Sequence, residues 1–442
     1  MSRVVSYVSG LLLLCLVVFV AGVYSGKRQT WPYRALSKLK SDARTVVREL
    51  PNLAGTKPTH WLVDSRYEGQ GVTRNDHDNT GEWILLQGFF DDQLELRLIQ
   101  RDGIVIAQWP VSHAALAGHI THVRNTPASD WNVGLHGALL LPDGSAVFSM
   151  DHIGLFKMDR CGKLVWSVDR PTHHSIERNA DGSFWVSSAS KVDSGTPTEH
   201  PLFRPPYAAD TLLHVSPEGE VLEEISLLDV FARSDMMGLL TLTGSIVPTT
   251  MVGSRPDFEQ EVFHLNDVEE LPEELAPAFP SFSTGDWLLS LRNRNLILVV
   301  DRQTRTIKWW HIGPWVRQHD PDWSPDGTIT VFDNNRDGTD VGAILGSSRI
   351  VAVDPVTRDT KVRYGGPEEF FYAERRGKQQ ALDDGSLLIV EAEAGRVFEV
   401  DAARQVTWEY VNRYDKTHAA RVTDAVAYDV GFFTVHDWSC RE

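Results

Sequence analysis

This chain is poor in basic residues for its length. Its 442 residues carry 43 Lys and Arg against 60 Asp and Glu, which gives a formal net charge of −17. Non-specific binding to nucleic acid depends on a basic surface that neutralises phosphates, so we expect no nucleic-acid partner. A local basic pocket stays possible, because the charge of a pocket can oppose that of the whole protein.

Cysteine is almost absent as well. The three cysteines are Cys15, Cys161 and Cys440, and none stands in a CxxC pair or at zinc-finger spacing from histidines. Cys15 lies in an apolar run, so the rest of the chain can form at most one disulfide, and the sequence leaves its formation open. No P-loop is present either. These absences indicate a protein without a metal or another cofactor.

Long hydrophobic runs are missing except at the N-terminus. There an apolar stretch extends from about Val4 to Val23 behind Arg3. Its length predicts a signal anchor or a signal peptide in residues 1–25. The Val-Tyr-Ser sequence that ends the stretch is a poor cleavage site, which favours an uncleaved anchor.

Residues 26–60 are interpreted as a linker with a short helix, because apolar residues recur at helical spacing between Trp31 and Pro51. Lys and Arg residues follow the apolar run directly, and the positive-inside rule would keep them in the cytoplasm. The short basic N-terminus indicates the opposite orientation, with export of the C-terminal part. The residues alone leave the side of the membrane open.

From Glu82 onward, short β-rich runs alternate with Asp-Gly, Glu-Gly and Gly-Lys turns. Four such runs recur in about forty residues, which are the dimensions of a propeller blade. The sequence therefore predicts an all-β fold, a six-bladed β-propeller over residues 61–442. A seventh blade or a β-sandwich pair is the alternative. The six units begin near Trp83, His136, His174, His264, His319 and Gly377.

Histidines recur at one position of this repeat. His136, His174 and His319 each stand seven residues ahead of an Asp-Gly turn, and His264 opens a unit whose turn is delayed by an acidic insertion. The head of the innermost strand of each blade borders the central channel. Polar residues line any wet channel, so a single histidine there would mean little. Four in register predict a pocket of converging imidazoles.

The segments around these histidines, taken in order, resemble the bacterial arylsulfotransferases that do not use PAPS. Arg292 lies in the second run of the His264 unit and belongs to the pattern. The matching segments are HHSIE around His174, FHLND around His264, SLRNRN around Arg292 and QHDPDW around His319. Each motif is short, but their order and their placement in the blades make the combination fairly specific.

The resemblance covers the chain from about His136 to Tyr410. It implies a six-bladed propeller with its active site at the channel, where one histidine takes a sulfuryl group from an aryl sulfate. By motif, the nucleophile looks like His319. The residues that resemble those holding the sulfate are His174, His264 and Arg292.

The sequence departs from the family pattern after the arginine, where Asn293 and Arg294 follow Arg292 in place of His-Gln. Arg294 is therefore a rival of Arg292, and His173 is a rival of His174. We expect His136 and Arg294 to support the site from behind the residues that touch substrate. We expect only the anchor and a helix ahead of the propeller, where the larger family members have an N-terminal β-rich domain.

These residue types suit sulfuryl transfer. Arg292 can bind sulfate oxygens in a forked, charge-assisted way. A protonated histidine can donate to the departing phenol oxygen, and a neutral imidazole can attack sulfur. The implied reaction moves a sulfuryl group from an aryl sulfate to a phenolic acceptor through a sulfohistidine, without PAPS and without a metal ion.

Other functions remain open. The segment Asp159–Trp166 resembles the docking turn of quinoprotein-like propellers, in which Trp packs between blades, so a non-catalytic membrane-anchored scaffold is the main alternative. A sulfatase-like hydrolase with water as acceptor is the second. The resemblance favours export, so we expect the propeller on the periplasmic or extracytoplasmic side, attached to the membrane by the N-terminal helix.

Overall fold

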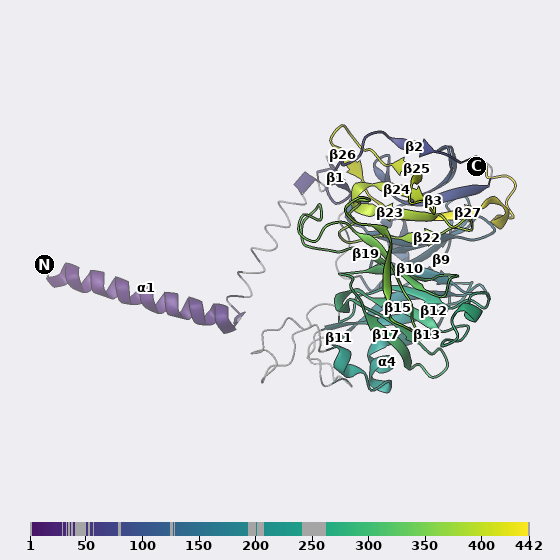
Figure 1. Cartoon of the computed structure of the whole chain (residues 1–442). Helices are drawn as coiled ribbons and strands as arrows, with labels where there is room; N and C mark the ends of the chain where they lie inside the picture. The colour runs from purple at the N-terminus through teal and green to yellow at the C-terminus, as the bar shows by residue number, and fades with distance from the viewer. Residues whose placement is uncertain are drawn as a thin grey trace. The chain divides into compact units, whose positions relative to one another are not determined.

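The computed structural model describes residues 2–28, 30–31 and isolated positions between 33 and 55, then residues 57–440 except 78–80, 124–126, 128, 193–199, 201–206 and 241–261. The chain forms two compact units, Met1–Thr59 and His60–Glu442 (Figure 1).

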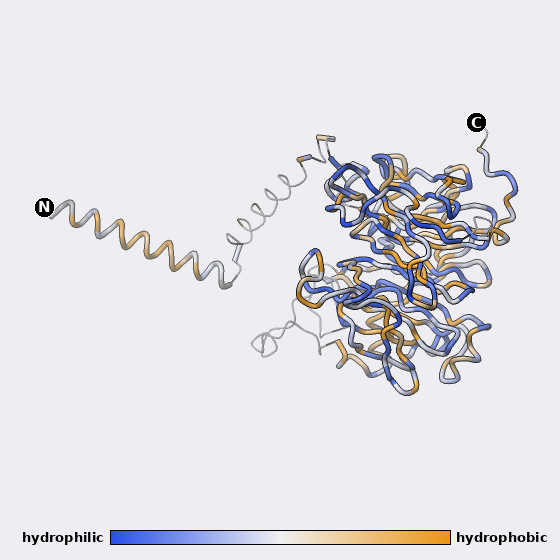
Figure 2. Tube along the Cα trace, turned by 45° about the horizontal axis from the view of Figure 1, so that its top comes forward, coloured by the Kyte–Doolittle hydropathy of each residue, from blue (hydrophilic) through white to orange (hydrophobic). Residues whose placement is uncertain are grey.

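The first unit contains the apolar helix α1 (Ser2–Arg28). Its segment Tyr7–Gly26 is long and apolar enough to cross a membrane, and none of it is buried. Figure 2 shows the apolar residues that recur along this helix. The prediction of an N-terminal apolar helix is confirmed. The predicted linker helix between Trp31 and Pro51 lies largely outside the described residues.

The second unit is built from six antiparallel sheets, which are the six blades of a propeller (Figure 1). Blade 1 contains, from the channel outward, β27 (Val422–Asp429), β3 (Glu82–Phe90), β4 (Gln93–Gln100) and β5 (Val105–Val111). Blade 2 contains β6 (Leu135–Leu140), β7 (Ala146–Met150), β8 (Gly154–Met158) and β9 (Leu164–Val168). Blade 3 contains β10 (Thr172–Arg178), β11 (Phe184–Val192), β12 (Tyr207–Val215) and β13 (Val221–Ser226).

The remaining blades follow the same order. Blade 4 contains β14 (Leu265–Glu270), β15 (Trp287–Leu291), β16 (Leu296–Val300) and β17 (Ile307–Ile312). Blade 5 contains β18 (His319–Trp323), β19 (Ile329–Asp333), β20 (Arg349–Val353) and β21 (Thr360–Gly365). Blade 6 contains β22 (Gln379–Ala381), β23 (Leu387–Glu391), β24 (Arg396–Val400), β25 (Val406–Val411) and β2 (Gly71–Asn75). The connections carry the helices α3 (His113–Leu116) and α4 (Leu227–Arg233).

Strands from both ends of the second unit close the ring. The C-terminal β27 pairs with β3 as the inner strand of blade 1, and β2 pairs with β25 as the outermost strand of blade 6. A further pair joins β1 (Leu62–Asp64) to β26 (His418–Ala420). The first repeat unit is degenerate in sequence because its inner strand comes from the other end of the chain. The prediction of an all-β, six-bladed propeller is confirmed.

Asp-Gly turns set the length of the inner strands. In blade 2, the Ser145 amide donates to Asp143 Oδ1 (2.9 Å), and Gly144 has a φ of 78°. Asp181 and Gly182 repeat this turn in blade 3, where φ is 84°. A short Asp side chain can cap such a turn, and glycine tolerates the positive φ. Because the turn fixes the strand register, residues at equal distance from it reach the same end of the channel.

Tryptophans join neighbouring blades. The indole N–H of a Trp in the fourth strand from the channel donates to a carbonyl of the next blade, at 2.7–3.0 Å. The four pairs are Trp109 with Asp159, Trp166 with Pro217, Trp309 with Pro355 and Trp408 with Arg101. The docking turn that ends in Trp166 therefore has a packing role that needs no quinone.

A disulfide between Cys161 and Cys440 answers the question that the sequence left open. Cys161 lies in the turn between β8 and β9 of blade 2, and Cys440 lies in the tail that follows β27. The bond closes a loop of 279 residues and ties this tail to blade 2, next to the strand that closes the ring. Cross-links of long loops contribute about 2–5 kcal/mol to stability.

Candidate active site

Four inner strands carry a β-bulge at the end where the histidines stand. Within three of these bulges one residue has a positive φ, namely Gly137 (83°), His174 (58°) and Asp320 (51°), and in blade 4 His264 (56°) directly precedes the bulged strand β14. For a residue other than glycine this conformation costs roughly 1 kcal/mol or more, and such strain gathers at functional sites. A bulge re-aims side chains that would otherwise alternate between the two faces of the sheet.

The re-aimed histidines come together in what we call the histidine layer, formed by His136, His174, His264 and His319. The ring centres of His136 and His174 are 4.1 Å apart, and those of His174 and His264 are 4.7 Å apart. The His319 ring lies 6.1 Å from His174 and 6.4 Å from His136. All four side chains are buried. The structure thus brings together the four histidines that share a repeat position, while their individual roles remain predictions.

His173 joins this layer because the bulge of β10 is wider than the others. The three residues between Thr172 and Ile176 stand opposite a single residue, Ser187, on β11. His173 Nδ1 lies 2.8 Å from His174 Nδ1, and His174 Nε2 lies 3.2 Å from His264 Nε2. Each N–N contact needs one proton, so a neutral His174 donates to one neighbour and accepts from the other. The three imidazoles form a continuous hydrogen-bonded chain.

His319 contacts a polar side chain from the adjacent strand end. Its Nδ1 lies 2.6 Å from Asn334 Oδ1. The amide nitrogen of Asn334 donates to the main-chain carbonyls of Ala373 and Arg376, both at 2.8 Å. His319 Nε2 is buried and makes no hydrogen bond within the part of the chain that the structure describes.

Three residues next to the histidine layer share a structural position. Asp151 directly follows β7, Arg292 follows β15 and Asn334 follows β19, each the second strand of its blade. Antiparallel pairing places the end of a second strand beside the head of the inner strand. Asp151 Oδ1 accordingly lies 3.9 Å from His136 Nδ1. Sequence motifs point only to Arg292, although the end of a second strand is itself a signal for the other two.

The two rival arginines differ in their surroundings. Arg292 begins the 3-10 turn η5 (Arg292–Arg294), so it lies just beyond the second strand and not within it as the sequence suggests. Its amide donates to the His264 carbonyl at 3.1 Å, and its charge acts on His319. Arg294 is buried and donates from Nε to a main-chain carbonyl, and burial lowers its pKa to about 10. Arg292 is therefore the one whose charge reaches His319.

Burial lowers the pKa of His136, His174 and His319 well below the usual value for histidine. The next cause differs for each pKa: the charge of Arg376 for His136, the imidazole of His136 for His174, and the charge of Arg292 for His319. These imidazoles are therefore neutral at pH 7, and positive charge at this end of the channel comes from arginine. An anion can be bound there beside a nucleophilic ring nitrogen.

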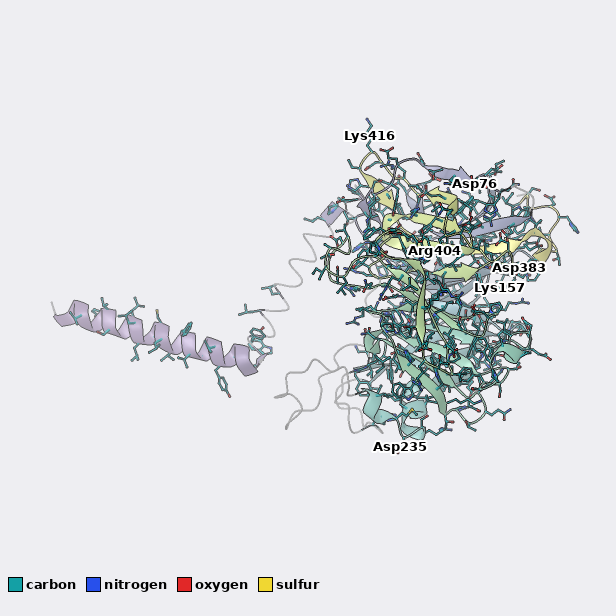
Figure 3. All side chains as sticks on the ribbon, viewed as in Figure 1. Asp76, Lys157, Asp235, Asp383, Arg404 and Lys416 are labelled. Carbon is teal, nitrogen blue, oxygen red and sulfur yellow. A yellow bond between two sulfur atoms is a disulfide. The ribbon has the colours of Figure 1, made fainter. Side chains whose placement is uncertain are left out.

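A second set of ionisable groups, most of them on the inner strands of blades 3, 4 and 5, surrounds Lys378, and we call it the carboxylate layer. Lys378 pairs with Asp320, and its Nζ lies 3.8 Å from Asp267 Oδ1. By contrast, charged residues such as Asp383 and Lys416 are exposed on the outside of the propeller (Figure 3). The carboxylates of this layer are Glu177, Asp267, Glu269, Asp320, Asp322 and Asp424.

The carboxylate layer holds protons at unusually high pH. Burial raises the pKa of Glu269 to about 7, and repulsion by Asp320 adds to this. Burial also raises the pKa of Asp424 to about 6, against the opposing attraction of Lys378. For Lys378 burial lowers the pKa, but the neighbouring carboxylates outweigh it and raise the pKa. The crowded acids and one lysine thus keep the net charge of this layer low.

Two further features bear on what the site can bind. Among the described residues, ligand atoms of His136, Asp151 and His174 lie within 4.8 Å of one another, a set that could hold a metal ion such as zinc. A cavity of about 720 Å³ lies elsewhere, between blades 1 and 6, with Arg97 and Tyr414 in its wall. No histidine is among the described residues that line it. The histidine layer is the candidate active site because the four imidazoles of the repeat gather there.

Comparison with known proteins identifies the family of this chain. A family model described as Arylsulfotransferase (ASST) matches residues 137–413. This chain belongs to the arylsulfotransferase family. The matched span of the arylsulfotransferase model runs from blade 2 to blade 6 and includes His174, His264, Arg292 and His319, whereas His136 directly precedes it. No curated protein sequence matches the chain.

Solved structures similar to this arylsulfotransferase-family chain include a protein of unknown function from Bacteroides caccae, with 12% identity, a TM-score of 0.44, and coverage of 77% of this chain and 99% of that one. Another is the WD40 β-propeller domain of Doa1, with 11% identity and a TM-score of 0.40. The match covers 85% of this chain and 99% of that domain's chain. A third is virginiamycin B lyase from Staphylococcus aureus, with 12% identity and a TM-score of 0.36. The match covers 63% of this chain and 71% of the lyase chain.

Proposed function

We propose that this protein is a membrane-anchored arylsulfotransferase that moves a sulfuryl group from an aryl sulfate to a phenol, with His319 as nucleophile. The observation that carries the proposal is the histidine layer, in which four buried imidazoles from different blades meet beside Arg292. Packing alone offers no reason to bury four imidazoles together, because each must find hydrogen-bond partners.

In the first half-reaction, the Nε2 lone pair of His319 attacks sulfur and the bond between sulfur and the aryl oxygen breaks. Arg292 binds the sulfate oxygens, whose charge shifts in the transition state. The departing aryl oxygen accepts a hydrogen bond from an imidazole N–H of His174 or His264 and takes its proton from solvent. The products are a sulfohistidine and a free phenol. The low pKa of His319 supports this role, since only a neutral imidazole can attack.

In the second half-reaction, an acceptor phenol gives its proton to the neutral imidazole of His264 or His174, which passes it on to solvent. Its oxygen attacks sulfur, and the bond between nitrogen and sulfur breaks, which restores neutral His319. The chain of imidazoles supports this cycle because it offers an N–H donor in the first step and a proton acceptor in the second. Nucleophile, anion-binding group and proton carrier are all side chains of this protein, so the proposed reaction uses neither PAPS nor a metal ion. In this proposal His136 and Arg294 do not contact the substrate and instead hold the residues that do.

The disulfide bears on the side of the membrane. Disulfides persist in oxidising compartments and are rare in the cytosol. The Cys161–Cys440 bond therefore supports a propeller on the periplasmic or extracytoplasmic side, held by the apolar segment Tyr7–Gly26. Proteolysis of the propeller by protease added to intact spheroplasts is the expected result. Protection until the membrane is dissolved would place it in the cytoplasm.

The activity is tested on the full chain in detergent micelles with 4-nitrophenyl sulfate as donor and phenol as acceptor. Wild type and the exposed control His436→Ala should release 4-nitrophenol in a phenol-dependent way, and His319→Ala should lose the activity by a factor on the order of 10³ or more. Phenol-dependent release that survives in His319→Ala contradicts the nucleophile. No release by wild type with several donors favours a scaffold, and release without phenol favours a hydrolase.

A further inference from the structure

We propose that Asn334 is a positioning residue that selects the tautomer of His319, so that Nδ1 carries the proton and Nε2 is the nitrogen that attacks. Asn334 directly follows β19, and its Oδ1 lies 2.6 Å from His319 Nδ1. The proposal deepens the proposed function and rests on it for the attacking role. The tautomer itself can be measured whether or not the protein transfers sulfate.

The orientation of the Asn334 amide is fixed by its surroundings. Its nitrogen lies 2.8 Å from the main-chain oxygen of Ala373 and 2.8 Å from that of Arg376. Main-chain oxygens only accept hydrogen bonds, so both contacts require the amide NH₂ group. A flipped amide would place its oxygen against two other oxygens. The hydrogen-bond network therefore assigns the end of the side chain that faces His319 as the oxygen.

The fixed oxygen in turn determines where the imidazole proton lies. Asn334 Oδ1 can only accept, so a contact of 2.6 Å with His319 Nδ1 requires a proton on Nδ1. A neutral imidazole has a single N–H, which leaves the lone pair on Nε2. That nitrogen is buried and makes no hydrogen bond to the described residues, so none of those groups competes for its lone pair.

An amide suits this task better than a carboxylate. Aspartate in the same place would also accept from Nδ1–H, but its negative charge would stabilise the protonated imidazolium, which has no lone pair on Nε2. Burial and the charge of Arg292 lower the pKa of His319, and a neutral partner leaves that effect intact. Asn334 thus orients the ring without making it hold a second proton.

Two nearly isosteric variants separate orientation from structural support. Asn334→Leu and Asn334→Asp both remove the NH₂ group and its two bonds to main-chain carbonyls. Only aspartate keeps an acceptor for His319 Nδ1. The matched control is Asn335→Leu, because Asn335 is also buried and its amide nitrogen also donates to two main-chain carbonyls, those of Leu345 and Ser347 at 3.0 Å.

The first readout is nitrogen NMR of the full chain in micelles with ¹⁵N-labelled histidine rings, with the His319 signals assigned by their loss in His319→Gln. Wild type and Asn335→Leu should show a protonated Nδ1 and an unprotonated Nε2. Asn334→Leu should shift the ring toward the tautomer with the proton on Nε2, which isolated histidine favours. A proton on Nε2 in wild type, or an unchanged tautomer in Asn334→Leu, overturns the proposal.

The second readout is the pH profile of phenol-dependent transfer. Asn334→Leu should lower kcat on the order of 10³-fold with KM little changed, as expected for a ring in the wrong tautomer. Asn334→Asp should recover most of that loss at high pH, and its activity should begin at higher pH than in wild type. Equal losses in both variants would mean a purely structural role. If wild type transfers no sulfate, the NMR result still decides the tautomer, so the two proposals can fail separately.

Discussion

The histidine layer and the carboxylate layer share blades 3, 4 and 5, yet one consists of bases and the other of acids. Burial favours the neutral form in both: it lowers the pKa of His319 and raises that of Glu269. The surroundings then differ. The histidines face arginines, whereas the carboxylates face one another and a single lysine, Lys378.

This contrast bears on the proposed binding of an anion by an acidic protein. At the histidine layer, the charges of Arg292 and Arg376 act on neutral imidazoles, although Asp151 lies 3.9 Å from His136 and Glu393 lies 3.8 Å from Arg376. In the carboxylate layer, Lys378 is already paired with Asp320. An anion that moved deeper would meet carboxylates without a free partner. Under the proposed function, the histidine layer is therefore the end of the channel at which we expect a sulfate ester to bind.

The largest expected difference between the layers is in catalysis. His264→Gln should lower kcat/KM on the order of 10²–10³-fold, because it removes a hydrogen bond to the transition state. Asp322→Asn should leave kcat/KM close to wild type, because Asp322 belongs to the carboxylate layer, where burial raises its pKa, and the amide keeps nearly the same size without the charge. Phenol-dependent turnover of 4-nitrophenyl sulfate measures both. A comparable loss of kcat/KM in Asp322→Asn would contradict the assignment of catalysis to the histidine layer alone.

The next largest effect is on stability. Lys378→Met removes the one cation among the buried carboxylates and should lower the free energy of unfolding by about 3 kcal/mol. Lys378→Arg keeps the charge and is the control. Tryptophan fluorescence of the full chain in urea measures the change. If the two variants unfold alike, the charge of Lys378 does not hold the carboxylate layer together.

The smallest effect is a pH dependence with a definite sign. The pKa of Glu269 is about 7 in the folded protein and about 4.5 when unfolded. The folded state therefore keeps a proton that the unfolded state has lost, and the stability from this group declines as the pH rises from 4.5 to 7. Glu269→Gln cannot titrate and should gain roughly 2 kcal/mol relative to wild type between pH 4.5 and pH 7.5.

Urea unfolding at several pH values measures this gain. The histidines work in the opposite sense: their lowered pKa makes the folded state release protons that the unfolded state holds, so their contribution grows as the pH rises toward 6.5. Each layer can thus be recognised by the sign of its slope. A difference between Glu269→Gln and wild type that does not vary with pH would contradict the raised pKa.

The repeat pattern was enough to predict the blades and the meeting of the histidines. The distance from His136 and His174 to their Asp-Gly turns determines their height in the channel, because the turn fixes the strand register. Closure by β27 was not predictable, because pairing between distant segments depends on a contact that leaves no local pattern. The same holds for the Cys161–Cys440 bond, for which both partners were known but their distance was not.

The candidate site divides in the same way. Arg292 was found through a motif, but Asn334 and Asp151 were not, although all three follow the second strand of a blade. The prediction that Arg292 lies within the second strand was wrong by one residue, because the chain turns into η5 at that point. The carboxylate layer was missed because acidic residues on a strand are usually solvated, and only the closed ring buries these together.

The sequence by itself determined the all-β propeller, the apolar N-terminal helix and the set of histidines at one repeat position, since all three depend on local spacing. Only the tertiary structure decided which groups surround each ring. It placed Asn334 against His319, linked His173 to His174, and gathered six carboxylates around Lys378. Protonation depends on burial and on charges a few ångströms away, and neighbours at that distance come from different blades. The sequence could therefore locate the imidazoles, but not say which nitrogen carries the proton.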